Sequence, residues 1–145
     1  MSIDYLNLTI KLLKKINTKN NKKIIKAAKY FYKTYTKGGL IYIFGTGHSH
    51  LISLDGHYRA GGFAAICPIL DKKIMLHKNS IKGAQYERTP GIAKKILDKY
   101  LIKSSDTFVV FSNSGVNQAP IEAAYYALKK GCKVIAISSS NYAKI

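Results

Sequence analysis

Leu40-Ile41-Tyr42-Ile43-Phe44, followed directly by Gly45-Thr46-Gly47-His48-Ser49-His50, is the stretch that decides the fold. Five consecutive apolar residues are typical of a β-strand that is buried on both faces, as strands are in parallel sheets. The six residues that follow are small or polar, and two of them are glycines. The change predicts that the strand ends near residue 44 and that a tight loop leads into a helix.

The same pattern recurs further along the chain. Phe108-Val109-Val110-Phe111 precedes Ser112-Asn113-Ser114-Gly115-Val116-Asn117, and Val134-Ile135-Ala136-Ile137 is a further apolar run. We expect a fourth strand over 63–66, and helices over 49–60, 91–102 and 118–130. Strands that alternate with helices predict the α/β class, here a doubly wound, flavodoxin-like parallel sheet with helices on both faces.

Two further helices are predicted within residues 1–37. Ile3, Leu6, Ile10 and Leu13 recur every three or four residues, and a second apolar stripe starts at Ile24. The polar residues 17–21 indicate a break between the two helices. Residues 71–90 show the least regular pattern, so we expect a long connection there.

The composition predicts one soluble domain with an unusual charge. The chain has 145 residues, 47% of them hydrophobic, and a formal net charge of +17 from 24 basic and 7 acidic residues. Only Arg59 and Arg88 are arginine, the residue most used to read bases, and no nucleic-acid-binding motif accompanies the lysines. We therefore expect a solvated lysine surface and no specific nucleic-acid partner. Incidental affinity for polyanions is the alternative.

Neither export nor membrane insertion is indicated. No apolar run approaches the roughly 20 residues of a membrane span, and no signal-peptide pattern follows Met1. Cys67 and Cys132 stand far apart in apolar surroundings, which predicts buried free thiols. We expect a cytoplasmic protein without a membrane partner.

The loops after the strands at 40–44 and 108–111 predict an anion site. In an open parallel sheet, ligands bind beyond the carboxyl ends of the strands. Glycines let the backbone approach a ligand closely, helix starts present free N–H groups, and serine hydroxyls add donors. Either loop alone is also compatible with ordinary turn and capping roles. Together they predict a phosphate cradle formed by Gly45, Thr46, Gly47, His48, Ser49, Ser112, Asn113, Ser114, Gly115 and Asn117.

Two common nucleotide motifs are absent. A P-loop needs Gly-Lys-Ser/Thr, and no lysine follows Gly47. A dinucleotide fingerprint needs a third glycine where His50 stands, and Asp71 comes late for its acidic partner. No nucleotide or nicotinamide cofactor is therefore expected.

The motifs resemble the sugar isomerase (SIS) domain family. The residues that carry the resemblance are Gly45 to His50, Tyr58-Arg59-Ala60-Gly61-Gly62, Ser112 to Gly115, Asn117, Pro120-Ile121-Glu122 and Gly131 to Ile137. It covers roughly residues 1–140 and is closest to uncharacterised bacterial SIS proteins allied to phosphoheptose isomerase and N-acetylmuramic acid 6-phosphate etherase.

The resemblance implies a flavodoxin-like sheet, a sugar-phosphate ligand and at least a homodimer. It also implies phosphate contacts from Ser49, Ser112 and Ser114. Family members usually run well beyond 200 residues, with a further strand and C-terminal helices after Ser138-Ser139-Ser140. We therefore expect residues 1–145 to form a single SIS domain, with N-terminal helices over 1–37 and a truncated core over 38–145.

Candidates for proton transfer lie near the first loop and in the irregular segment. Aldose–ketose isomerisation needs a base that works near neutral pH. The candidates are His48, Asp55, His57 and Glu87, each of which could instead be a surface or structural residue. Arg59 is a candidate phosphate or carboxylate partner. His48, His50, Asp55 and His57 are also possible metal ligands, but their spacing matches no known zinc pattern, so no metal is expected.

Three functions remain open. The first is a sugar-phosphate isomerase or related lyase, the second a non-catalytic module that senses a phosphosugar, and the third a lysine-rich polyanion-binding protein. A DNA-binding regulator with a fused helix-turn-helix domain is not expected, because residues 1–37 are too few for that domain.

Overall fold

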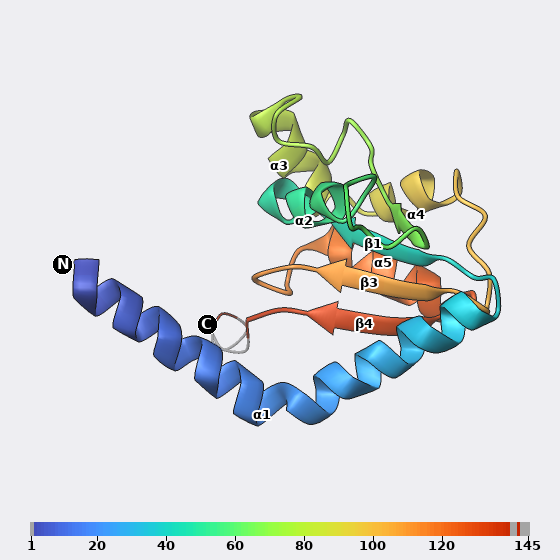
Figure 1. Cartoon of the computed structure of the whole chain (residues 1–145). Helices are drawn as coiled ribbons and strands as arrows, with labels where there is room; N and C mark the ends of the chain where they lie inside the picture. Colours follow the sequence, from blue (N-terminus) through green and yellow to red (C-terminus); the bar gives the residue numbers. More distant parts are fainter. Residues whose placement is uncertain (1, 140–141, 143–145) are drawn as a thin grey trace.

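The computed structural model describes residues 2–139 and 142, and it contains a four-stranded parallel sheet in the order β2-β1-β3-β4. The strands are β1 (Ile41–Gly45), β2 (Ile66–Pro68), β3 (Thr107–Phe111) and β4 (Lys133–Ile137). Residues 140–141 and 143–145, the end of the predicted domain, lie outside the described residues. Figure 1 shows the strands running in one direction across the middle of the molecule.

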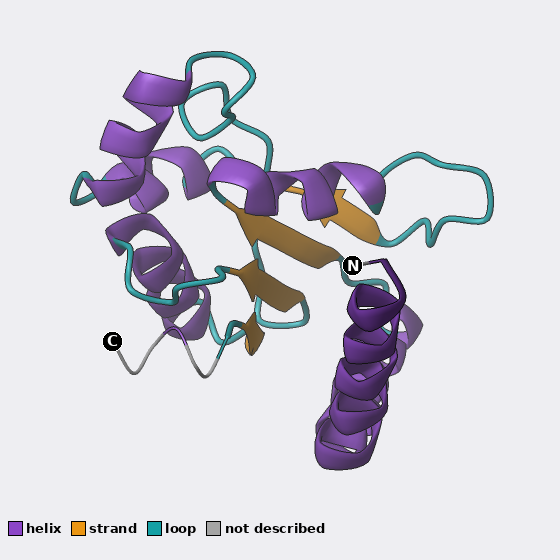
Figure 2. Cartoon of the chain, turned by 90° about the vertical axis from the view of Figure 1, so that its left-hand side faces the viewer, coloured by secondary structure: helices purple, strands orange, loops and turns teal. Residues whose placement is uncertain are grey.

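Helices cover both faces of the sheet (Figure 2), which confirms the doubly wound α/β prediction. Successive strand residues point to opposite faces, so β1 contributes to two separate apolar clusters. Tyr42 and Phe44 pack with α4 (Ile92–Leu97) and α5 (Gln118–Lys129). Ile41 and Ile43 face the other side, where Phe31 of α1 (Ser2–Thr36) packs and α2 (His50–Asp55) lies nearby.

The strand order creates a switch point between β1 and β3. From β1 the chain first adds β2 on one side and then crosses to add β3 on the other side. At such a point the two connections that leave the carboxyl ends diverge to opposite faces, and ligands bind in the space between them. Both predicted loops start here.

One N-terminal helix replaces the two predicted helices. α1 runs unbroken for 35 residues, through the polar residues 17–21 that we expected to break it. Asparagine, threonine and lysine each cost only some tenths of a kcal/mol in a helix, and neither glycine nor proline is present to interrupt it. Thr18 also donates its hydroxyl hydrogen to the carbonyl of Lys14 or Lys15, which satisfies that side chain within the helix.

Several other predicted boundaries were wrong. α2 and α4 span six residues each, shorter than the helices expected over 49–60 and 91–102. The fourth strand, β2, overlaps the expected 63–66 only at Ile66. The segment 71–90, expected to be irregular, contains α3 (Ser80–Arg88), and a short 3-10 helix η1 (Gly47–Ser49) precedes α2.

Both cysteines are free thiols, as predicted. Cys132 is buried, whereas Cys67 is half-buried. Burial raises the pKa of Cys132 to about 11 and also raises the pKa of Cys67, so both thiols stay protonated and unreactive near neutral pH. No helix in residues 2–139 is long and apolar enough to cross a bilayer.

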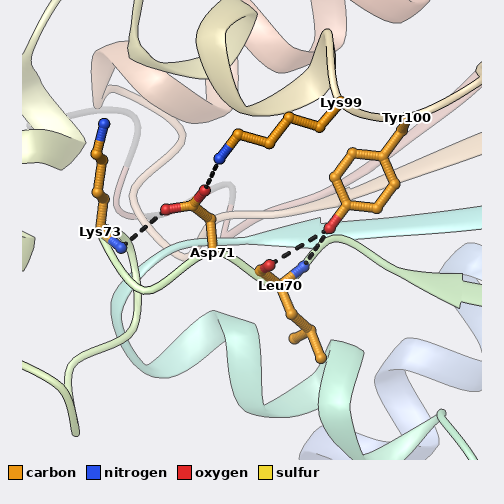
Figure 3. Close-up of polar contacts among 5 residues, drawn as sticks. All are labelled: Leu70, Asp71, Lys73, Lys99 and Tyr100. Atoms are coloured by element: carbon orange, nitrogen blue, oxygen red, sulfur yellow. Dashed lines mark hydrogen bonds and ion pairs between the residues drawn. The ribbon is translucent and has the colours of Figure 1, made fainter.

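Figure 3 shows the contacts that hold the segment before α3 against the connection after α4. Asp71 accepts hydrogen bonds from the Lys99 ammonium (2.6 Å) and from the backbone N–H of Lys73 (2.9 Å). The backbone N–H of Leu70 donates to the Tyr100 hydroxyl (3.0 Å). Burial alone would raise the pKa of Asp71, but the hydrogen bonds outweigh it and hold the pKa below its usual range.

This contact predicts a stability difference that depends on pH. A carboxyl with a lowered pKa stabilises the fold above its unfolded-state pKa of about 3.9, and the stabilisation is lost as pH falls through the folded-state pKa. We expect Asp71→Asn to lower the free energy of unfolding at pH 7 by about 1 kcal/mol, a value limited by the exposure of Lys99. Urea unfolding between pH 7 and pH 3 should show the difference shrinking toward acid pH.

Asp55→Asn is the matched control, because Asp55 forms an ion pair with Arg59 in which both side chains are mostly exposed. It should change stability little at any pH. A loss for Asp71→Asn that is the same at every pH would contradict the electrostatic explanation.

Candidate functional site

The two predicted loops begin side by side. Gly45, the last residue of β1, is in register with Phe111, the last residue of β3. The loop over residues 45–50 and the loop over 112–117 therefore leave the same edge of the sheet from neighbouring strands. This is the edge of the sheet at which the anion site was predicted.

The first loop is wound tightly against the end of its strand. A Cβ on Gly45 would lie 2.5 Å from the carbonyl oxygen of Ser49, so only glycine fits there. Gly47 has a φ of +58°, which favours glycine, and its N–H donates to the carbonyl of Ile74 (3.2 Å). The Ser49 N–H donates to the carbonyl of Thr46 (3.0 Å), which closes the turn.

The second loop uses its serines as internal acceptors. The N–H of Gly115, whose φ is +68°, donates to Ser112 Oγ (3.1 Å), and the N–H of Val116 donates more weakly to Ser114 Oγ (3.5 Å). A hydroxyl that accepts from the backbone keeps its own hydrogen free to donate. Both serines can therefore donate to an anion while they shape the loop.

Glu87, near the end of α3, joins the two loops. Its Oε1 atom accepts a hydrogen bond from Thr46 Oγ1 (2.7 Å) in the first loop and another from Asn117 Nδ2 (2.6 Å) in the second loop. Its Oε2 atom lies on the side of Gly47, 3.8 Å from where a Cβ on that residue would be. A carboxylate is thus fixed at the boundary between the loops.

The positive potential at this edge of the sheet comes from the start of α5. α5 begins directly after the second loop, and its first N–H groups carry the positive end of the helix dipole. Asn117 precedes α5 but donates to Glu87 instead of capping the helix with its side chain. The first N–H groups of α5 therefore have no side-chain cap, and helix starts of this kind can donate to a phosphate oxygen.

Two surface hollows lie away from the two loops. One of about 720 Å³ opens between α4 and α5, and one of about 370 Å³ lies along residues 58–64. No residue of 45–50 or 112–117 lines either hollow. The candidate site is therefore an open edge of the sheet in a single chain, and its assignment depends on the strand ends and on Glu87.

Of the four predicted proton-transfer residues, two lie at the loops and two do not. Glu87 lies between the loops, and His48 is an exposed residue of the first loop. Asp55, at the end of α2, accepts both hydrogen bonds of an exposed pair with Arg59 (2.8 and 2.9 Å), so Arg59 is neither buried nor in the cradle. His57 is exposed and lies beside the ring of Tyr58.

His50 supports the first loop from inside. It is 2% exposed, and its Nδ1 donates to the carbonyl of Gly47. Its Nε2 is buried without a hydrogen-bond partner, and its ring centroid lies 5.3 Å from that of His77. Over residues 2–139, no three histidine, cysteine, aspartate or glutamate side chains are close enough together to hold a metal ion.

The link through Glu87 could not be read from the sequence. Its two partners are 41 and 30 residues away in the chain, and the helix that carries it was not expected. The sequence did contain one signal for the start of α3. Asn79 directly precedes α3, and its side chain accepts from the N–H of Lys82 (2.8 Å), which is an ordinary helix start.

Comparison with known proteins agrees with the fold. The family model for the SIS domain matches residues 4–139. UPF0309 proteins of Brucella ovis, Brucella canis and Brucella abortus are each 51% identical over 102 residues, which are 70% of this chain and 42% of theirs. The matched part is therefore less than half the length of those relatives.

Solved structures show the same architecture. A phosphoheptose isomerase GmhA from Neisseria gonorrhoeae superposes with a TM-score of 0.77 at 19% identity, over 99% of this chain and 77% of that one. A phosphoheptose isomerase from Francisella tularensis gives a TM-score of 0.66 at 22% identity, over 99% and 78%. At such identity the likeness concerns the fold alone. With the family match over most of its length, the chain belongs to the SIS domain family.

Proposed function

We propose that this SIS domain binds a phosphosugar at the edge formed by residues 45–50 and 112–117 and catalyses proton transfer on it, as a sugar-phosphate isomerase or a related lyase does. The observation that carries the proposal is the position of Glu87. A carboxylate that bonds to both loops at the switch point is placed next to any ligand that the loops hold. Membership of a phosphosugar-binding family supports the choice of ligand.

In this proposal the phosphate group binds at the second loop and the start of α5. Ser112 and Ser114 donate their hydroxyl hydrogens, with Asn113 and Gly115 supplying backbone close to the ligand. Ser49 and the backbone of Gly45 to His48 approach from the first loop. All these donors are neutral, so they select an anion through geometry and the helix dipole.

The sugar then extends from the phosphate toward Glu87, which we propose as the base. Oε1 is occupied by Thr46 and Asn117, and this fixes the carboxylate while Oε2 faces Gly47 in the first loop. Oε2 would remove the proton from the carbon next to the carbonyl, forming an enediol, and would return it to the former carbonyl carbon. Two carbons exchange their oxidation states and no external oxidant or reductant is needed. His48 is the second candidate, as the acid that assists at the sugar oxygens.

The alternatives remain as follows. A non-catalytic phosphosugar sensor would use the same loops without proton transfer. A polyanion-binding protein would use the lysine surface, which the loops do not share, since residues 45–50 and 112–117 contain neither lysine nor arginine. A cytoplasmic location and a homo-oligomer are proposals as well.

The first experiment measures phosphosugar binding. A panel of hexose, heptose and amino-sugar phosphates, with inorganic phosphate and the parent sugars as controls, is titrated in a thermal-shift assay at physiological salt. One sugar phosphate should raise the melting temperature more than its sugar or phosphate alone, because a ligand selective for the folded state stabilises it. Ser114→Ala should weaken that binding by about ten- to a hundredfold, as expected for one lost hydrogen bond to a charged group.

Ser105→Ala is the matched control, because Ser105 is an exposed serine just before the opposite end of β3. It should leave the shift unchanged. If Ser114→Ala binds as well as the wild type, the cradle is assigned to the wrong residues. A shift that disappears with moderate salt and survives Ser114→Ala would favour polyanion binding.

The second experiment separates an enzyme from a sensor. The sugar phosphate identified above is incubated with the protein in deuterated water, and exchange at its carbon-bound hydrogens is followed by NMR. Glu87→Gln keeps an oxygen for Thr46 and Asn117 but removes the basic carboxylate, so exchange should fall by about 10²- to 10⁴-fold while binding persists.

Asp55→Asn should exchange at the wild-type rate, because Asp55 is an exposed partner of Arg59. Loss of exchange in Asp55→Asn but not in Glu87→Gln would make Asp55 the base and overturn our assignment. Binding without exchange in the wild type would identify a sensor.

A further inference from the structure

Glu122 belongs to a sequence signature that the candidate site does not use. Pro120-Ile121-Glu122 helped to carry the family resemblance, yet none of these residues lies in the two loops. Glu122 is half-buried on α5, and its Oε1 atom accepts hydrogen bonds from the backbone N–H of Gly91 (2.7 Å) and from Gln118 Nε2 (3.0 Å). The bond to Gly91 connects α5 to a distant part of the chain.

The helix dipole does not explain this carboxylate. A negative charge is stabilised by the dipole in the first turn of a helix, and the effect falls off beyond that turn. Glu122 lies beyond the first turn of α5, which contains no acidic residue. The contact with Gly91 is therefore the feature of Glu122 that needs an explanation.

Gly91 lies at the junction between α3 and α4. Three residues, 89–91, separate the two helices. Pro90 has a fixed φ, and the N–H of Thr89 donates back to the carbonyl of Tyr86 (3.0 Å) at the end of α3. The junction is therefore short, and its first two residues are stiff.

Gly91 is the flexible point of this junction. Its φ is +76°, a value that favours glycine, and a Cβ built on it would meet no atom within 4 Å. The space around this residue is open, so packing does not fix its conformation. The hydrogen bond to Glu122 fixes the orientation of the peptide group between Pro90 and Gly91, and with it the direction in which α3 joins α4.

α3 needs such a contact more than α4 does. In α3 only Gly83 is buried, and the ring of Tyr86 packs at the edge of the core. α4 buries four of its six residues, which are Ile92, Ala93, Ile96 and Leu97. The core therefore holds α4 in place, whereas the position of α3 depends more on polar contacts.

Two carboxylates join α3 and its junction to α5, in opposite directions. Glu87 of α3 accepts a hydrogen bond from Asn117, the residue before α5. Glu122 of α5 accepts one from Gly91, four residues after Glu87. One of these bonds alone would let the end of α3 turn about it. The two together fix the orientation of the carboxylate that we propose as the base.

The enclosure of Glu122 keeps its acceptor atom in one place. Its Oε2 atom is buried and has no hydrogen-bond partner among the residues that the structure describes. A buried acceptor without a partner costs stability, so an apolar side chain would be favoured here if only packing mattered. Because the carboxylate has no other donor to turn to, Oε1 stays directed at Gly91 and Gln118.

We propose that Glu122 is a positioning residue for Glu87 and acts through the backbone of Gly91. It fixes the junction after α3, and thereby the angle at which Glu87 presents its Oε2 atom to the first loop. Glu122 itself touches no ligand in this proposal. The inference rests on the proposed function, since it names a residue on which the proposed base depends.

Two variants separate the reach of the side chain from its charge. Glu122→Gln keeps an oxygen at the distance of Oε1, whereas Glu122→Asp keeps the charge but is shorter by one methylene group. NMR reads the result without any ligand. In Glu122→Asp, amide hydrogen exchange at Gly91 should rise about tenfold, as expected for one lost hydrogen bond, and the side-chain amide signals of Asn117 should shift because Glu87 moves. Glu122→Gln should behave like the wild type.

Proton transfer gives the second readout. With the sugar phosphate identified above at saturating concentration, Glu122→Asp should lower the deuterium exchange rate by about 10- to 100-fold, because a displaced base reacts that much more slowly. Its affinity for the ligand should stay close to that of the wild type, since the proposed phosphate donors lie in the loops. A general loss of structure would weaken binding and lower the melting temperature as well.

Asp98→Asn is the matched control. Asp98 lies at the same contact between α4 and α5, where it accepts a hydrogen bond from the Tyr126 hydroxyl (3.0 Å) and pairs with Lys94. Both partners lie outside the junction. This variant should leave the Gly91 and Asn117 signals and the exchange rate unchanged.

The outcomes that would overturn the inference are distinct. If Glu122→Asp exposes Gly91 but leaves the signals of Asn117 unchanged, Glu122 is only a cap for α4. Equal losses in Glu122→Gln and Glu122→Asp would also contradict a role that depends on reach. If Glu122→Asp does not fold, Glu122→Met, which is apolar and of similar length, gives the same readouts. No exchange in the wild type would overturn the proposed function, and the NMR signals would then decide alone whether Glu122 positions Glu87.

Discussion

The parallel pairing of β1 with β3 is the constraint on which the candidate site depends. These strands are in register from Ile41 and Thr107 to Gly45 and Phe111, so both chains leave the sheet at the same level. Because β2 was added on the other side of β1, the connection after β1 and the connection after β3 leave in different directions. Two loops of small residues then flank one space, and neither has to be long or mobile to reach it.

The segment between β2 and α4 completes this space. It is held at its start, where Asp71 and Leu70 contact Lys99 and Tyr100 (Figure 3). Further along the segment, Ile74 accepts a hydrogen bond from Gly47 of the first loop, and α3 presents Glu87 to Thr46 and Asn117. The geometry of one carboxylate thus depends on hydrogen bonds at the start of its segment as well as at its end.

The parts of the fold that the sequence predicted are those with a strong local signal. Runs such as Phe108 to Phe111 are typical of strands buried on both faces, so three of the four strands were predicted at nearly the right positions. Gly45 is required by close backbone approach and Gly47 by its positive φ, so the tight loop after β1 was also predicted correctly. Boundaries were predicted less well where the local preference is weak. Thr18 and its polar neighbours tolerate a helix, and the short α3 has no clear apolar stripe. The contact of Glu87 with both loops is set by tertiary structure, and no pattern near residue 87 encodes it.

The distribution of charge separates the candidate anion site from the lysine-rich surface. The net charge of +17 alone would not distinguish the two. An anion site built from lysines would attract any polyanion and would lose affinity steeply with salt. Here the candidate anion site has no lysine or arginine in either loop, and its donors are hydroxyls, backbone N–H groups and a helix start. A site of that kind selects its ligand by shape, and the hydrogen-bonded carboxyl group of Glu87 lies at its side. The lysines of α1 lie outside both loops, so they raise the net charge without contributing side chains to the candidate site.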